Sequence, residues 1–488
     1  MAITPGDNLN SVPASRKQTL STNYLDLSSG DNAGWGQQYV PDLMEKEAEV
    51  FGPRTISGFL AKIGAEEAMT ADQVVWSEQG RLHLSYKGKL TADNTFLVQA
   101  DIDEANYIQA GLDTAHGVRL NDTVVVSNAN GVFKAMVTGI ANNDSLTLSA
   151  YDGVDIDQLN TDKTTTILVY GSEYGKARRY QADNDAANDV DSRGANEPQF
   201  QTFTNKPIIM KDYYEVSGSD ASRIGWVEIS TEAGQGGYLW YLKAESDTRA
   251  RFNDYVEMSM LESVKGSGSN GVDDYLGHAN VGTQGLFDAI EDRGNVTSGI
   301  TGVNAATDLA EFDAILAEFD KQGAIEENMM FVNRATSLAI DDMLASMNSY
   351  GAGGTSYGVF DNSEDMALNL GFSGFRRGSY DFYKSDMRYL NDKATRGGIN
   401  DAAGSGEIRG VMIPAGSSSV YDQTVGASIK RPFLHVRYRA SQTDDRRMKT
   451  WTTGSVGAAT SALDAMQLHF LTERCLVTQG ANNFMLLK

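Results

Sequence analysis

Two glycine-rich strings in the sequence match motifs that carry chemistry in other proteins. Gly354–Gly358 (GTSYG) has the spacing of a nucleophile elbow, in which the central serine, here Ser356, attacks an acyl group. Gly266–Gly271 (GSGSNG) has the spacing of a dinucleotide-binding loop, whose backbone amides hold a pyrophosphate. Both chemistries need a strand before the motif and a helix after it, because that turn aims the serine or the amides.

Neither string has this context. The residues before the first motif, Asn348–Gly353, predict a flexible loop rather than a strand. Gly266–Gly271 follows a predicted helix and precedes the acidic pair Asp273 and Asp274. We therefore interpret both strings as loops.

A polar run at 183–197 contains acidic residues that could suggest a calcium loop. Its carboxylates belong to Asp183, Asp185, Asp189 and Asp191. The EF-hand register fails, because the glycine at loop position 6 and the glutamate at position 12 are missing. We interpret this run as a solvated loop.

The five histidines do not complete a catalytic or metal-binding pattern. His435 and His469 lie in apolar, strand-like stretches, whereas His83, His116 and His278 have no local acid–base partner. No P-loop, HExxH or CxxC motif is present. We nominate no catalytic, cofactor-binding or metal-binding residue and expect no cofactor. A hydrolase with an unfamiliar site stays open, because 65 acidic residues could pair in three dimensions.

Composition and charge narrow the class of protein. The chain has 488 residues, which favours several sub-domains, and 41% of them are hydrophobic, which is enough for real cores. The net charge is −24. Because neutralising phosphates requires a basic surface, the chain shows no sign of gripping nucleic acid. If it encloses DNA, it does so by geometry.

The single cysteine and the N-terminal residues indicate the cellular compartment in which the protein is made and acts. Cys475 cannot form an intramolecular disulfide, and its apolar surroundings predict a small core residue. Met1–Asp7 has neither the basic nor the apolar region of a signal peptide, and no apolar run is long enough for a transmembrane helix. We expect synthesis and function in the cytosol, or in a particle assembled there, and no membrane partner.

Residues 1–50 are polar and contain few apolar anchors. The anchors include Tyr24, Leu25, Trp35 and Tyr39. Such a segment cannot bury a core alone, so it is either a disordered tail or an extended arm that orders against a neighbouring subunit. The spaced aromatic residues favour the arm.

The stretch from Val74 to about residue 170 has a β pattern. Several short apolar runs predict strands: Val74–Trp76, Arg81–Tyr86, Phe96–Val98, Asp122–Val126, Val132–Ile140, Ser145–Ser149 and Thr166–Tyr170. Asn130 and Gly131 form a strong hairpin turn signal. Closely spaced strands of this kind predict a small barrel or sandwich.

Helices dominate the middle of the chain, and strands return at its end. Residues 238–264 predict a long helix whose apolar residues form no single stripe, as expected of a helix with neighbours on several faces. A second helix should begin with a capping box at Asp308 and stop at Gly323. Further predicted elements are a strand at 329–332, a helix at 335–347, and strands at 468–477 and 484–487.

This order resembles the Hong Kong 97-type capsid fold of tailed double-stranded DNA phages. Two stretches, Phe51–Leu60 running into Val74–Leu82 and the ending Glu473–Phe484, also look like major capsid proteins of that family. The resemblance implies an α+β fold with an N-terminal arm, extended loop, peripheral domain with a spine helix, and axial domain. The β stretch is longer than a plain extended loop, which implies an inserted β domain.

The implied parts have the following boundaries: N-terminal arm 1–60, extended loop 61–215 with the insertion at about 91–170, peripheral domain 216–300, axial domain 301–440, and peripheral C-terminal strands 441–488. The resemblance further implies a non-enzymatic virion protein that assembles with itself, as hexamers and pentamers, into an icosahedral shell. Portal, scaffold and decoration proteins would be its partners. A tail tube or sheath protein and a surface-layer protein are the alternatives.

Overall fold

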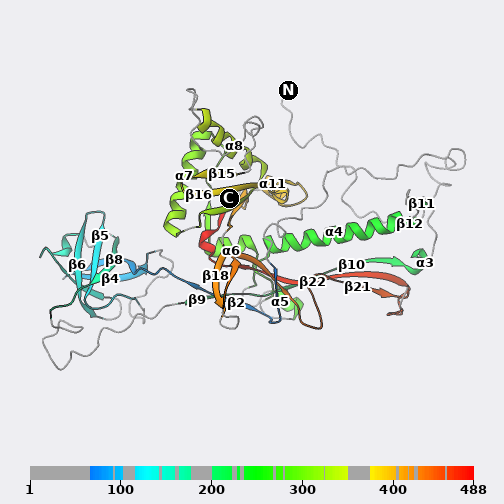
Figure 1. Ribbon diagram of the computed structural model, residues 1–488, viewed down its shortest axis with the longest axis horizontal. Coiled ribbons are helices and arrows are strands. Elements are labelled where there is room, and N and C mark those ends of the chain that lie inside the picture. Colours follow the sequence, from blue (N-terminus) through cyan, green and yellow to red (C-terminus); the bar gives the residue numbers. More distant parts are fainter. Residues whose placement is uncertain are drawn as a thin grey trace. The chain divides into compact units, whose positions relative to one another are not determined.

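The protein is described by a computed structural model (Figure 1), which belongs to the mixed α+β class. It describes residues 66–91, 94–102, 116–141, 145–159, 164–176, 200–221, 228–230, 236–266, 271–277, 281–323, 325–349, 374–402, 406–415, 417–422, 427–456 and 459–488. The predicted N-terminal arm and the stretch 51–60 lie outside these residues. The chain divides into two compact units, one of residues 77–202 and one of residues 1–76 with 203–488.

The unit of residues 77–202 contains a closed antiparallel barrel with strand order β3-β4-β7-β6-β5-β8. Its strands are β3 (Ser85–Thr91), β4 (Thr95–Asp101), β5 (Asp122–Asn128), β6 (Gly131–Ala141), β7 (Ser145–Ala150) and β8 (Thr164–Ser172). The hairpin predicted at Asn130 and Gly131 is confirmed, since it joins β5 to β6. The strand predicted at 81–86 is wrong over its first four residues, because β3 begins only at Ser85 and Leu82 is exposed.

The barrel interior is filled by side chains that alternate along the strands. Val124 and Val126 are fully buried, whereas Val125 between them is only half-buried, as a two-residue period requires. Ile156 and Leu159, from the 3₁₀ turn η2 (Ile156–Leu159), add to the same core. The barrel therefore has a hydrophobic core made only of residues from its own unit.

A five-stranded sheet in the other unit is organised around β22 (Ala465–Thr478). The first part of β22 lies between β10 (Ile208–Ser217) and β21 (Lys449–Gly454), and its last part pairs with β20 (Leu434–Arg439). β1 (Glu66–Met69) extends the sheet by pairing in parallel with β20. β22 therefore pairs both with its neighbour in the sequence, β21, and with the distant strand β10.

The long helix α4 (Leu239–Glu262) packs along β10 and β22 (Figure 1). Phe252 of the helix contacts Phe470 of β22, with ring centroids 6.0 Å apart. Val256, Met260 and Leu261 are buried further along the helix, where the short helix α6 (Leu286–Arg293) joins the same core. The scattered apolar pattern predicted several neighbours, and α4 contacts both the sheet and α6.

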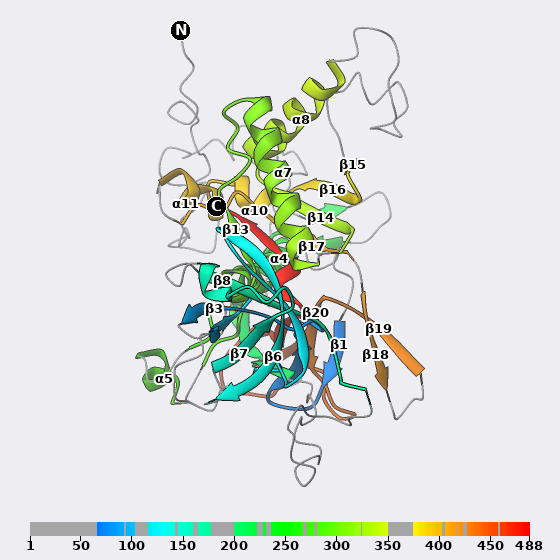
Figure 2. The same ribbon diagram turned by 90° about the vertical axis from the view of Figure 1, so that its left-hand side faces the viewer.

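A six-stranded mixed sheet has the order β13-β23-β17-β14-β16-β15. Its strands are β13 (Asn295–Thr297), β14 (Glu327–Val332), β15 (Gly374–Arg377), β16 (Tyr380–Asp386), β17 (Gly410–Pro414) and β23 (Met485–Leu487). Helices α7 (Ala305–Gln322) and α8 (Arg334–Ser349) lie together against it (Figure 2). An aromatic cluster joins helix and sheet, with the ring centroids of Phe312 and Phe382 5.1 Å apart.

The start of α7 corrects the predicted capping box. The helix begins earlier, and the Asn304 side chain accepts a hydrogen bond from the Thr307 N–H (3.0 Å). Asp308 lies inside the first turn, buried, and accepts a hydrogen bond from the Gly302 N–H. The predicted stop is confirmed, because Gly323 adopts the left-handed conformation that glycine tolerates best.

The central strands of the six-stranded sheet divide their side chains between two cores. Leu486 of β23 and Val411 of β17 point into the core that contains α4 and α6. Their neighbours Met485, Leu487 and Met412 point into the core beneath α7 and α8. One short apolar strand thus supplies both cores, because alternate side chains leave opposite faces of a sheet.

The remaining described elements are short. They are β2 (Val74–Gln79) paired with β9 (Phe200–Asn205), β11 (Glu228–Ser230) with β12 (Gly236–Tyr238), β18 (Ser417–Asp422) with β19 (Ala427–Pro432), and α3 (Gly218–Ala221), α5 (Gly271–Leu276), α10 (Arg388–Asn391), α11 (Arg396–Ala402) and η3 (Ala481–Asn483). The chain leaves one unit through β2 and returns through β9, so the barrel is an excursion between two paired strands.

We predict that Leu486→Ala destabilises the protein by about 2–5 kcal/mol, because it removes a fully buried side chain from the core that contains α4 and α6. Denaturant unfolding measures the change. Leu463→Ala, at an exposed leucine, is the matched control and should leave the midpoint almost unchanged. Equal midpoints for the two variants would contradict the central role of β23.

We predict that residues 77–202 fold as an independent fragment, because their core is internal and every barrel strand pairs on both sides within the fragment. Circular dichroism should give a β spectrum, and the amide resonances should be dispersed. Phe96→Ala, which empties the centre of the barrel, should abolish both signals in the fragment. A disordered wild-type fragment would show that the barrel depends on the rest of the chain.

Candidate assembly surfaces

The structure describes the surroundings of only one of the two motif strings. Gly354–Gly358 lies outside the described residues, as does the acidic run 183–197. Gly266 lies four residues after the end of α4, and its N–H donates a hydrogen bond to the Val281 carbonyl (2.9 Å). Gly271 begins the six-residue helix α5. A helix, rather than the strand that dinucleotide binding requires, therefore precedes the second string.

The described histidines are dispersed. His435 and His469 lie in β20 and β22, as predicted. His116 lies beside Tyr86 in the barrel unit, and His83 is exposed. Among the described residues, no group of three or more His, Cys, Asp or Glu side chains has a metal-binding arrangement.

Cys475 is a core residue, which confirms its interpretation from the sequence. The side chain is completely buried in β22. Burial raises the pKa of its thiol to about 12, because a thiolate would lose its hydration there. The thiol is therefore protonated and inaccessible at physiological pH.

A network of arginines and carboxylates joins β1 to β20 and β22. The buried carboxylate of Glu473 forms ion pairs with Arg439 at 2.9 Å and with Arg446 at 2.8 Å. Glu66 forms ion pairs with Arg447 at 2.5 Å and with Arg474 at 3.5 Å. Two further pairs, Arg437 with Glu67 and Arg439 with Asp72, extend the network along β1 and beyond it.

This network ties the first described strand to the end of the chain. Burial lowers the pKa of Arg474, yet the group stays charged because an arginine titrates far above neutral pH. Its guanidinium also donates to the carbonyl of Arg447 (2.6 Å) and to the hydroxyl of Thr472 (2.9 Å). Removing one partner would leave a buried charge, so the network fixes the position of β1.

The sheet face opposite α4 carries a row of aromatic side chains across three strands. The His469 ring stacks on Trp451 at 5.1 Å and on Tyr213 at 6.0 Å. Thr453 Oγ1 lies 2.6 Å from His469 Nε2 and fixes the imidazole. Tyr213 and Ile209, both on β10, are more than half exposed. This apolar face has no covering element among the described residues.

The short helix α5 has inverted polarity. Its apolar residues Val272, Tyr275 and Leu276 are 56%, 89% and 53% exposed, whereas Asp273 is buried. Asp273 Oδ1 accepts a hydrogen bond from the Val281 N–H (2.9 Å), which explains why the acid faces the protein. A helix that turns its apolar side chains to water is typical of a surface that another molecule covers.

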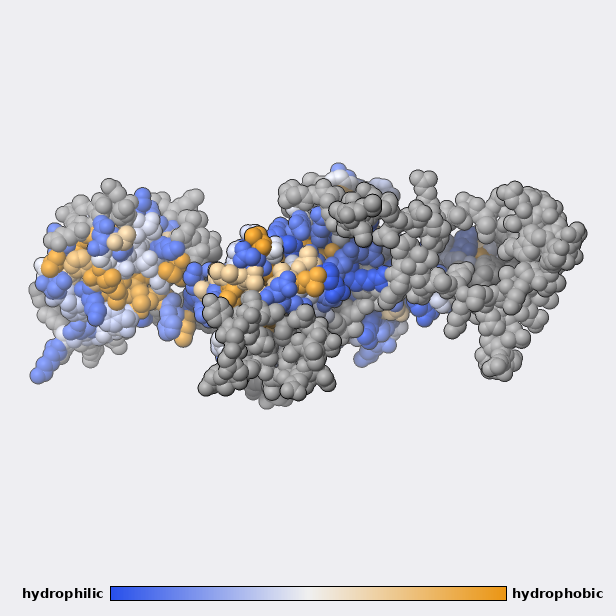
Figure 3. All heavy atoms as spheres, turned by 90° about the horizontal axis from the view of Figure 1, so that it is seen from above, coloured by the Kyte–Doolittle hydropathy of each residue, from blue (hydrophilic) through white to orange (hydrophobic). Residues whose placement is uncertain are grey.

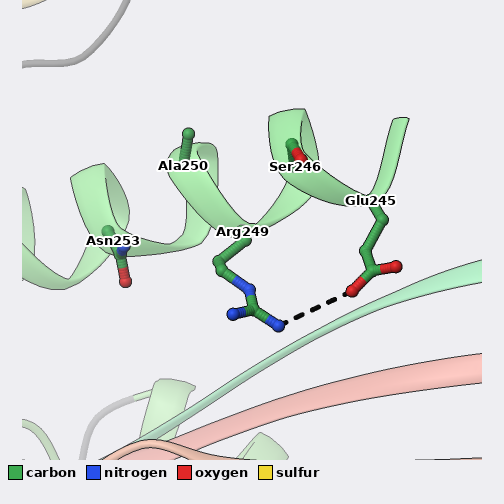
Figure 4. Close-up of a pocket in the computed structure, with 5 residues that line it drawn as sticks. All are labelled: Glu245, Ser246, Arg249, Ala250 and Asn253. Atoms are coloured by element: carbon green, nitrogen blue, oxygen red, sulfur yellow. Dashed lines mark ion pairs between the residues drawn. The ribbon is translucent and has the colours of Figure 1, made fainter. Parts of the chain in front are cut away.

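A shallow groove follows one side of α4 (Figure 4), with a volume of about 370 Å³. It is lined by Glu245, Ser246, Arg249, Ala250 and Asn253, and Glu245 pairs with Arg249 at 3.6 Å. All five residues come from the same helix, so the groove lacks the converging polar groups of a small-molecule site.

The barrel also exposes apolar residues between its charged ones. Figure 3 shows hydrophobic residues gathered on the face of the barrel that it displays. The exposed large apolar residues of the barrel unit include Val132, Ile140, Tyr151, Val154, Leu168 and Tyr170. Tyr151 donates to Glu173 (2.5 Å); burial, together with that carboxylate, raises its pKa to about 12.

Within the described part of the chain, no helix has both the length and the apolar character needed to cross a membrane.

No protein family and no curated protein matches the sequence. Solved structures similar to the chain come from phages. A structure from Microbacterium phage Oxtober96 has a TM-score of 0.37 and 10% identity, and covers 93% of this chain and 97% of that chain. The capsid structure of cyanophage P-SCSP1u has a TM-score of 0.37 and 6% identity, with 96% and 98% covered. The mature capsid of bacteriophage PhiM1 has a TM-score of 0.33 and 9% identity, with 65% and 79% covered.

The chain is thus similar to phage capsid structures, the class that the sequence resemblance named. All three TM-scores lie below 0.5, so the function proposed below rests on the geometry of the chain itself.

We predict that Cys475 in the folded protein resists alkylation at about pH 8, on the order of a thousandfold more than a free thiol. A raised pKa leaves less thiolate at any pH below it, and burial blocks the reagent. Mass spectrometry should detect labelling only after denaturant is added, and Cys475→Ser should show none under either condition. Rapid labelling of the native protein would contradict the described core.

Proposed function

We propose that this chain is the major capsid protein of a tailed phage and that many copies assemble into an icosahedral shell around the genome. The observation that carries the proposal is the order of elements. The barrel is inserted into the larger unit between β2 and β9. The long helix α4 follows and packs on the five-stranded sheet, and the six-stranded sheet with α7 and α8 comes next. The terminal strands β22 and β23 complete the two sheets. This order is the one expected of the Hong Kong 97-type capsid fold.

The surfaces of the chain support assembly with itself. The aromatic row on the sheet face and the inverted helix α5 expose apolar area that costs free energy in a dispersed subunit. Contacts between copies would remove that cost, and in a closed shell each copy would meet the same partners.

In this arrangement residues 1–60 are an arm that reaches a neighbouring copy. Residues 61–215 are the extended loop with its inserted β domain, 216–300 and 441–488 form the peripheral domain, and 301–440 form the axial domain. The copies would group as hexamers and pentamers. We further propose portal, scaffold and decoration proteins as partners, and assembly in the host cytoplasm into the virion.

The role is structural and not enzymatic in this proposal. The genome would be enclosed without sequence-specific binding, since a net charge of −24 disfavours a grip on phosphates. Charge repulsion between like surfaces would also keep the packaged DNA from sticking to the shell.

We predict that the purified full-length chain, alone or with co-expressed scaffold, forms closed shells of uniform diameter under the electron microscope. The particles should sediment far faster than a 52.8 kDa monomer. Tubes would instead support a tail protein, and flat lattices a surface-layer protein. A monodisperse monomer under all these conditions would overturn the proposal.

A further inference from the structure

Hydrogen bonds tie the exposed helix α5 and the described residues near it to the rest of the unit. Two backbone hydrogen bonds clamp the segments that flank it, from the Gly285 N–H to the Ser263 carbonyl (2.7 Å) and from the Gly266 N–H to the Val281 carbonyl (2.9 Å). Lys265 anchors the same region to Thr204, 2.9 Å from its hydroxyl. Within α5 the Asp273 carboxylate accepts a hydrogen bond from the Val281 N–H, and the apolar side chains of the helix are exposed.

A shallow cavity, open to the surface, lies elsewhere on the same unit and is lined by α4 and the α10–α11 segment. Its volume is about 470 Å³, and Met258, Tyr389 and Ile399 supply apolar walls. Glu262 holds these walls in place, because it accepts hydrogen bonds from the Tyr389 hydroxyl (2.7 Å) and from Arg396 (2.9 Å). The cavity is open to the surface and large enough for one aromatic side chain.

The charges beside the two features are complementary. Asp274 is exposed directly next to Tyr275 on α5. Lys393 and Arg396 line the cavity, and Lys393 is exposed. A tyrosine that entered the cavity would bring Asp274 toward these two cations, which favours the correct orientation of approach.

We propose that Tyr275 of one copy inserts into the Met258–Tyr389–Ile399 cavity of a second copy, with Asp274 facing Lys393. The inference rests on the proposed self-assembly and names one of its contacts. Figures 1 and 2 both show α5 and α11 apart from each other. Tyr275, here called the knob, and the cavity are therefore different patches of one surface. Such a contact is head-to-tail, and repeated copies related by it form a ring when the rotation closes.

Cysteine cross-linking tests the contact in the full-length chain. The sequence contains a single cysteine, which is buried, so the background is low. Tyr275→Cys and Ile399→Cys protein are purified separately, mixed, assembled and oxidised. A covalent dimer should form in the mixture and not in either protein alone. Dimers from Tyr275→Cys protein alone would mean that α5 meets α5, and no dimer in the mixture would overturn the proposal.

Charge exchange provides a second measurement, which leaves the apolar walls of the cavity unchanged. Asp274→Lys and Lys393→Asp should each raise the concentration needed for assembly by about tenfold, and the double variant should recover most of the loss. Tyr275→Ala should weaken assembly at least as much, whereas Tyr383→Ala, at another exposed tyrosine, serves as the control. Additive losses in the double variant would overturn the pairing.

These outcomes are distinct from failure of the proposed function. If wild-type protein forms shells but the cross-link and the charge rescue are both absent, the shell function stands and this contact is wrong. If wild-type protein forms another kind of oligomer, the mixed cross-link still reports whether knob and cavity meet in it.

Discussion

Strand β22 and the short strand β23 after it are the constraint on which the rest of the larger unit depends. β22 pairs with β10, β21 and β20, and β23 lies between β13 and β17 in the second sheet. The end of the chain is therefore needed before either sheet can be completed. Since the pairings of β22 with β10 and of β23 with β13 join residues about two hundred positions apart, both sheets depend on contacts between distant parts of the chain.

The arginine–carboxylate network has a different role from the hydrophobic cores. Buried ion pairs add little net stability, because desolvation offsets much of their attraction, but they strongly penalise a misplaced partner. Here Arg474 of β22 pairs with Glu66 of β1, and Glu473 of β22 pairs with Arg439, which also pairs with Asp72 just after β1. The network thus fixes β1 against β20 and β22, while the apolar contacts of α4 and β22 supply the driving force.

The surfaces left over by the two cores explain the assembly proposals. α5 faces water with its apolar side because Asp273 is used to fix the loop, and the sheet face opposite α4 exposes Tyr213 beside a stacked His469. Both features are unfavourable for an isolated subunit and favourable for one that is covered by neighbours. The barrel differs, since its strands close on themselves and leave no free edge to pair with another chain.

Several local elements were predictable from the amino-acid sequence: the helix α4, the glycine stop of α7, the Asn-Gly hairpin of the barrel, and the buried cysteine. These follow from periodicity, turn chemistry and composition, which act over a few residues. Only the tertiary structure decided which distant strands pair, that Asp308 is buried while Asn304 caps the helix, and that α5 turns its apolar side outward. A local pattern cannot encode these outcomes, because each depends on groups that the fold brings together from remote parts of the chain.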